Sequence, residues 1–146
     1  MKYSKATNYA LHTIVYLALL PSGKTIGVKP LAEVQKVSPT YLSKVLTNLV
    51  KAGFIESSTG VKGGYTLVKD VRDITFLDVI HAIEGTAFSF HCSLENAVHD
   101  KHNCFIGHVM NEAERKKEEY LRAQTIANVL RQVDQEIVDY IMNAAN

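Results

Sequence analysis

The chain has 146 residues, of which 47% are hydrophobic and 21% are charged, and it contains two cysteines. This length and composition fit one globular domain, or a domain with an appended arm, and they exclude disordered and collagen-like chains. No apolar run approaches the roughly 18 residues that span a bilayer. We therefore expect a cytoplasmic protein with no membrane partner, in which two cysteines are too few for a disulfide scaffold.

The charges are distributed unevenly along the chain. Ten of the 16 Lys and Arg residues, but only four of the 15 Asp and Glu residues, lie in residues 1–75, so this part carries a net charge of +6 and the remainder −5. A basic half followed by an acidic half indicates that the first half binds a polyanion and that the second half has another role, such as pairing with a partner chain. Chance clustering of surface charge is the alternative.

The first half carries the pattern of a helix-turn-helix. Apolar residues spaced three and four apart predict a helix over residues 3–20, and a short helix is expected over residues 28–35. Ser38 caps a third helix, which begins at Pro39 and stops at Gly53. Because so few residues separate the second and third helices, the two are expected to meet at a tight angle.

A glycine-rich hairpin follows the third helix. Residues 54–57 and 65–68 have the composition of short strands, and the connection over residues 58–64 contains three glycines. A helix-turn-helix followed by a flexible hairpin is a winged helix. A further helix is predicted over residues 76–83, behind Thr75 as its cap.

The second half begins with a segment that shows no clear periodicity, residues 86–103, which we interpret as a loop. A long helix is predicted over residues 104–121 and a last helix over residues 126–142. The expected fold class is therefore mostly α, with a small β-hairpin wing and a long separate helix.

The third helix and the wing hold the candidate DNA-binding residues. A helix in the major groove presents hydrogen-bonding side chains to base edges, and a cation between glycines approaches the sugar-phosphate backbone closely. The residues with these properties are Ser38, Thr40, Tyr41, Ser43 and Lys44 in the helix, and Lys62, Gly63 and Gly64 in the wing. A helix whose polar face is only solvated is the alternative.

Five short motifs stand in order along the chain. They occupy residues 9–11, 38–46, 49–53, 60–67 and 74–85, and they read YAL, SPTYLSKVL, LVKAG, GVKGGYTL and ITFLDVIHAIEG. Together they resemble the Rrf-two family of bacterial winged-helix transcriptional regulators over essentially the whole chain. The resemblance implies a homodimer that pairs through the long helix near residues 104–121 and binds a palindromic operator in double-stranded DNA.

The resemblance also implies how the chain is organised. Residues 1–85 form a winged-helix DNA-binding domain, residues 86–103 a sensor loop, and residues 104–146 the dimerisation helices. By position, the residues implied to lie near DNA are Tyr41, Lys44, Lys62, Gly63, Gly64 and Tyr65.

The two cysteines fall at the ends of the expected loop. Cluster-binding members of the family carry three cysteines there, whereas this chain has only Cys92 and Cys104, with Val98 where a middle cysteine would fall, so no cofactor is predicted. Cys104 opens the long helix, whose dipole lowers the pKa of a thiol, and Cys92 is available to resolve a sulfenic acid on Cys104. We therefore expect a repressor that is controlled by redox or nitrosative modification of Cys92 and Cys104.

Other functions are left open by the same residues. An iron–sulfur or metal-sensing regulator would use cysteine together with His91, His99, His102 and His108. Three further alternatives remain. The thiols are inert and buried, or an effector binds near the loop, or the winged helix binds a protein and not DNA. The sequence shows none of the usual hydrolase, nucleotide-binding or metalloprotease motifs, so no enzyme is expected.

Overall fold

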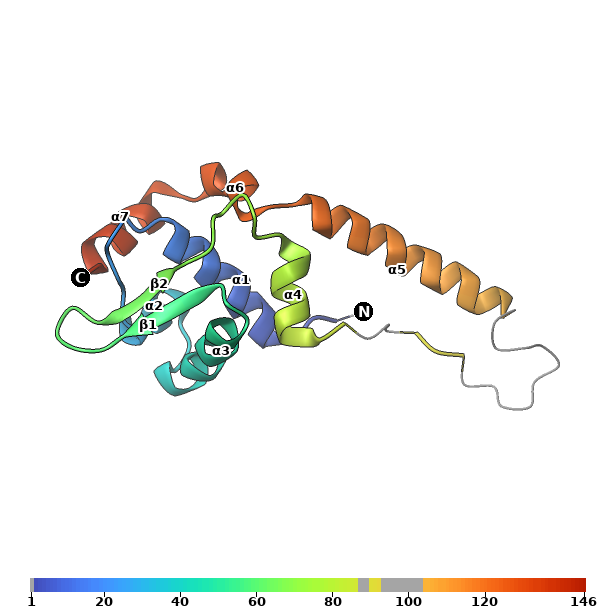
Figure 1. The fold of residues 1–146 in the computed structure, drawn as a ribbon, viewed down its shortest axis with the longest axis horizontal. Helices are drawn as coiled ribbons and strands as arrows, with labels where there is room; N and C mark the ends of the chain where they lie inside the picture. The colour runs from blue at the N-terminus through green and yellow to red at the C-terminus, as the bar shows by residue number, and fades with distance from the viewer. Residues whose placement is uncertain (1, 87–89, 93–103) are drawn as a thin grey trace.

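The computed structural model describes residues 2–86, 90–92 and 104–146. In chain order its elements are α1 (Lys5–Ala18), α2 (Val28–Gln35), α3 (Pro39–Lys51), β1 (Ile55–Ser58), β2 (Gly64–Leu67), α4 (Phe76–Glu84), α5 (Phe105–Ala123), α6 (Ile126–Val129), a 3₁₀ turn (Leu130–Gln132) and α7 (Gln135–Ala144) (Figure 1). The expected fold class, mostly α with a two-stranded antiparallel wing, is confirmed.

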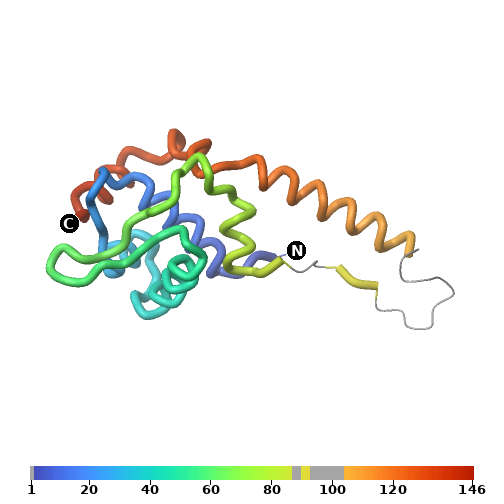
Figure 2. The backbone as a smooth tube through the Cα atoms, in the orientation of Figure 1, coloured from blue at the N-terminus to red at the C-terminus, as the bar shows by residue number. Residues whose placement is uncertain are grey.

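The structure consists of a body and an arm. Helices α1 to α4, the hairpin and the last two helices form the body, and α5 extends away from it alongside α4 (Figure 1). Figure 2 shows that the wing tip and the end of α7 lie at the opposite end of the molecule from the tip of the arm. Among the described residues, no helix is both long enough and apolar enough to cross a membrane.

The helix-turn-helix consists of α2 and α3, as predicted. The Ser38 hydroxyl accepts a hydrogen bond from the Tyr41 amide at 3.1 Å, and Pro39 occupies the first turn, where no intrahelical donor is needed. The buried face of α3 consists of Leu42, Val45, Leu46 and Leu49. Burial of each of these side chains stabilises the body by about 2 kcal/mol, so this face fixes which side of α3 remains outside.

The wing is joined to the body by a third short segment. Strand β1 pairs with β2 in antiparallel register, from Ile55 opposite Leu67 to Ser58 opposite Gly64. Ile26, which precedes α2, exchanges two backbone hydrogen bonds with Tyr65, at 2.8 and 3.1 Å. The hairpin is therefore fixed at its base by the body, while its outer loop extends beyond the paired residues.

The start of α4 and the end of α5 meet at one place on the body. Thr75 caps α4 with a capping box, in which its hydroxyl and the Asp78 carboxylate each accept a backbone hydrogen bond. The Phe76 amide donates to the Gln124 carbonyl oxygen at 2.8 Å, and the Ile126 amide donates to the Ile74 carbonyl oxygen at 2.9 Å. The start of α4 and the end of α5 are thus tied together.

The prediction of one continuous helix over residues 126–142 is wrong. The chain forms α6, the 3₁₀ turn and α7, because Val133 is extended and Asp134 stands as the N-cap of a new helix. The break lets Ile126 and Ile141 both enter the core of the body, where each is 0% exposed. Within the region predicted for dimerisation, 104–146, only α5 stands apart from the body.

Candidate nucleic-acid interface and thiol pair

One face of α3 presents its polar side chains to solvent. Of the predicted contact residues in this helix, Thr40 and Lys44 are exposed, Ser43 is half-buried, and the hydroxyl of Ser38 serves the helix cap. This places the capped N-terminus, with its positive dipole end, on the same surface as Lys44. The surface has the donors and the charge that a helix in the major groove needs.

Tyr41 is held at the edge of this face. Its ring packs edge-to-face against Tyr9 of α1, with ring centroids 5.7 Å apart and planes at 78°, and 36% of the residue is exposed. The contact fixes the ring direction at low entropy cost, because a side chain that is already held loses little freedom on binding. No signal in the sequence indicates that Tyr41 has this partner on α1.

Lys62 lies at the exposed tip of the wing, while the neighbouring glycines allow close contacts within the protein. A Cβ atom on Gly63 would lie 2.5 Å from the Ser58 carbonyl oxygen, and one on Gly64 would lie 2.7 Å from the backbone of Ile26. Both glycines are therefore required by the turn and by the approach of the wing to the body. Tyr65 is half-buried and packs against the core.

The positive charge of the first half is exposed on the surface of the protein. The nine lysines of this half are all exposed, and they are Lys2, Lys5, Lys24, Lys29, Lys36, Lys44, Lys51, Lys62 and Lys69. A field of exposed cations attracts a polyanion over a distance of roughly 10 Å at moderate salt. The charge distribution thus supports a polyanion-binding surface on the body.

The structure brings Cys92 and Cys104 together at the start of α5. Cys104 is buried and is the N-cap of the helix, where its sulfur accepts a hydrogen bond from the Gly107 amide at 3.3 Å. That hydrogen bond, together with a side-chain hydrogen bond to Cys92, lowers the pKa of the Cys104 thiol, although burial acts against the shift. A thiol with a lowered pKa and a second thiol in contact is suited to two-electron redox chemistry.

Among the described residues, the donors at this place are too few for an iron–sulfur cluster within one chain. Clusters are held mainly by thiolates, four in the common sites, and Cys92 and Cys104 supply two. Within residues 2–86, 90–92 and 104–146, no group of three His, Cys, Asp or Glu side chains gathers to hold a metal ion. The predicted alternative ligands His99 and His102, and Val98, lie outside the described residues, as does most of the expected sensor loop 86–103.

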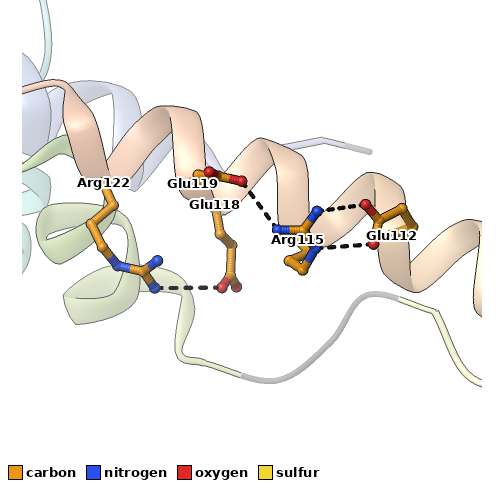
Figure 3. A network of polar contacts seen from close by, with 5 residues as sticks. All are labelled: Glu112, Arg115, Glu118, Glu119 and Arg122. Atoms are coloured by element: carbon orange, nitrogen blue, oxygen red, sulfur yellow. Dashed lines mark hydrogen bonds and ion pairs between the residues drawn. The ribbon is translucent and has the colours of Figure 1, made fainter.

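Along α5, one face is charged and another is apolar. Figure 3 shows the charged face, where Arg115 contacts Glu112 at 2.6 Å and Glu119 at 3.1 Å, and Arg122 lies 3.9 Å from Glu118. The exposed apolar side chains of α5 are Phe105, Ile106, Val109, Met110 and Tyr120. Exposed apolar side chains at helical spacing along one arm are typical of a protein–protein contact surface.

The chain is similar to known bacterial regulators over most of its length. A sequence model of the Rrf2 family, described as "Iron-dependent Transcriptional regulator", matches residues 3–132. The chain is 32% identical over 135 residues to the Bacillus subtilis protein named "Putative HTH-type transcriptional regulator YwgB", which covers 91% of this chain and 86% of the relative.

Two solved structures share the fold. The structure of T. potens IscR is 26% identical in sequence with a TM-score of 0.73, and the match covers 93% of this chain and 90% of that one. The oxidized form of Staphylococcus aureus CymR is 26% identical with a TM-score of 0.75, covering 92% of this chain and 100% of that one. The family and these relatives are regulators and not enzymes, as expected from the sequence. The chain therefore belongs to the Rrf2 family of winged-helix, DNA-binding transcriptional regulators.

Proposed function

We propose that this protein is a cytoplasmic, homodimeric repressor that binds a palindromic operator and is controlled by the oxidation state of Cys92 and Cys104. The observation that carries the proposal is the contact between the two thiols at the N-terminus of α5, where Cys104 also accepts the Gly107 amide. This pair lies at the N-terminal end of α5, which is the free end of the arm that we assign to dimerisation. A covalent bond here changes the segment between the DNA-binding body and the partner chain.

The proposed DNA contacts divide between the helix and the wing. Tyr41, Lys44 and their neighbours on α3 read base edges in the major groove, because they stand on the exposed face at its capped end. Lys62 binds a phosphate, because a cation at an exposed loop tip meets the backbone before it meets a base. Gly63, Gly64 and Tyr65 shape the wing and bring Lys62 to that place.

The proposed dimer forms through the exposed apolar side chains of α5. Val109 is 67% exposed and Tyr120 66% exposed, so pairing with a second copy removes both from water. A two-fold symmetric dimer presents its two α3 helices to two half-sites about one turn of DNA apart, and this symmetry is the reason for a palindromic operator.

The proposed switch is a two-electron oxidation. The Cys104 thiolate attacks a peroxide, takes one oxygen atom to become a sulfenic acid, and releases water after proton uptake. The Cys92 sulfur then attacks the sulfenic sulfur, the disulfide forms, and the hydroxyl leaves as a second water. A dithiol reductant returns both thiols by exchange. The proposal that this chain responds to oxidation is supported by its similarity to Staphylococcus aureus CymR, of which an oxidized form has been solved.

The experiment is a titration of the purified protein against DNA from upstream of its own gene, before and after mild peroxide treatment and again after reduction. We expect tight binding in one state, a change of about tenfold or more on oxidation, and recovery with reductant. Cys104→Ser should still bind DNA and should ignore peroxide. A normal peroxide response of that variant would overturn the thiol switch while leaving the regulator in place.

Two surface variants test the DNA assignment in the same titration. Lys62→Ala should weaken binding to all sequences alike and reduce the slope of log K against log salt by about 1. Tyr41→Ala should change which operator variants are preferred. If wild-type protein shows no salt-dependent DNA binding in either redox state, the proposed function is wrong and a winged helix that binds a protein is favoured instead.

A further inference from the structure

The outer loop of the wing is bound by two side chains that come from elsewhere in the chain. The hydroxyl of Thr25, between α1 and α2, donates to the Lys62 carbonyl oxygen at 2.8 Å. The side-chain amide of Asn146, just beyond α7, donates to the Gly63 carbonyl oxygen at 2.7 Å. These residues are 37 and 83 positions away from their partners, and they bind the carbonyl groups of Lys62 and of Gly63 after it.

Thr25 and Asn146 also hold each other. The Asn146 side chain donates its second hydrogen to the Thr25 hydroxyl at 3.2 Å, and the Asn146 backbone amide donates to the Thr25 carbonyl oxygen at 2.8 Å. The two side chains thus form one connected unit that spans from the body to the wing. We call this unit, Thr25 and Asn146, the wing clasp.

The clasp is anchored in the body. Ile141 of α7 is fully buried in the core, and the Tyr140 hydroxyl lies 3.2 Å from both the Pro30 carbonyl oxygen and Glu33 Oε2 of α2. Helix α7 therefore cannot shift without disturbing the helix-turn-helix. Because Asn146 follows α7, this helix sets the position of the wing loop relative to α2 and α3.

The loop has few other restraints at its tip. Pairing between β1 and β2 ends at Ser58 and Gly64, and inside the loop the Gly63 amide bonds to the Gly60 carbonyl oxygen at 3.0 Å. Val61 is 99% exposed, so no apolar packing holds the tip. The wing loop is therefore held in one conformation mainly by the hydrogen bonds that it receives from outside the hairpin.

We propose that Thr25 and Asn146 are positioning residues that hold the wing loop in the conformation in which Lys62 meets a DNA phosphate. The inference rests on the proposed DNA-binding function of Lys62, and it adds the residues that position this lysine. A lysine on a fixed loop loses less freedom on binding than one on a free loop, and so gives more affinity for the same contact.

The first test uses the free, full-length protein without DNA. Exchange of the Gly63 amide hydrogen, which bonds to the Gly60 carbonyl oxygen inside the loop, is compared between wild type and Asn146→Ala, with Asn143→Ala, an exposed asparagine on α7, as the matched control. We expect exchange in this loop to be about threefold faster or more in Asn146→Ala and unchanged in the control. Equal exchange in all three proteins overturns the clasp.

The second test is a double-mutant cycle on operator affinity. Lys62→Ala should weaken binding by about fivefold in wild type but by about twofold or less in the Asn146→Ala background, because the lysine is no longer placed. Thr25→Val should behave like Asn146→Ala, and Thr25→Ser, which keeps the hydroxyl, should restore the full effect of Lys62→Ala. Melting temperatures of all variants show whether the body has stayed folded.

The outcomes separate this inference from the function on which it rests. If wild type binds the operator and Lys62→Ala costs the same affinity in every background, the clasp is overturned and the DNA-binding function stands. If wild type binds no DNA, the proposed function fails. In that case the exchange measurement still decides whether Thr25 and Asn146 hold the loop.

Discussion

The carboxylate of Glu84 accepts two hydrogen bonds from Ser4, one from the backbone amide at 2.7 Å and one from the hydroxyl at 2.6 Å. The Thr7 hydroxyl adds a third at 2.6 Å. One side chain at the end of α4 therefore ties down the N-terminal cap of α1. The hydrogen bonds from Ser4 and Thr7 lower the pKa of Glu84, because they stabilise the charged form.

Stability should depend on pH through this carboxylate. A glutamate whose folded pKa lies below its unfolded value stabilises the fold above the unfolded value and loses that contribution as pH falls through the folded value. Glu84→Gln should lower the free energy of unfolding by about 1 kcal/mol at pH 7, and the difference from wild type should shrink below pH ~4. Urea unfolding at pH 7 and near pH 3.5 measures it; a constant difference would contradict the assignment.

The turn of the helix-turn-helix should be strengthened by a glycine. Among the described residues other than glycine, Lys36 alone has a positive φ, 54°, and an L side chain is strained there. Lys36→Gly should raise the free energy of unfolding by about 0.5–1 kcal/mol, whereas Lys36→Ala, which keeps a Cβ atom, should not. Thermal unfolding of the three proteins distinguishes relief of strain from loss of the lysine charge.

The wing should not tolerate a side chain at Gly64. Its φ is +151°, and an added Cβ atom would meet the Ile26 carbonyl oxygen at 2.7 Å, so Gly64→Ala should cost about 2–3 kcal/mol or detach the hairpin from residue 26. Gly60→Ala, at φ +99° with open space around it, should cost only about 1 kcal/mol. Similar losses in the two variants, measured by urea unfolding, would argue against the close contact with Ile26.

A charge on the apolar face of the arm should separate the dimer. Val109→Glu buries an unpaired carboxylate if α5 pairs, so we expect a monomer in sedimentation and at least about a tenfold loss of operator affinity. Asn111→Glu adds the same charge two positions on, where a helix turns to another face, and should remain dimeric. A dimeric Val109→Glu protein would place the interface elsewhere.

Much of the fold follows from local signals. Ser38 before Pro39, Thr75 three residues before Asp78, and Cys104 before the long helix each mark a helix start that the structure confirms. Such caps are readable because a side chain and the backbone group it satisfies lie within one turn of each other. The same locality predicted the hairpin, whose turn residues are contiguous.

What the sequence could not reveal depends on contacts between distant segments. The break at Val133 was not predicted, because the apolar spacing continues across it. Only the position of the core in the folded protein shows that α6 and α7 are separate helices. Thr25 and Asn146 belong to no motif, and their role appears only when α7 is seen beside the wing. The proximity of Cys92 to Cys104 is likewise a matter of loop path and not of spacing.

The backbone bridge between Thr75 and Thr125 joins the start of α4 to the residues just after α5, so the chain between them leaves this point and returns to it. Helix α4 packs on α1 and α3 within the body and on α5 in the arm. A displacement of α5 would therefore reach α3 through the packing of α5 on α4 and of α4 on α3.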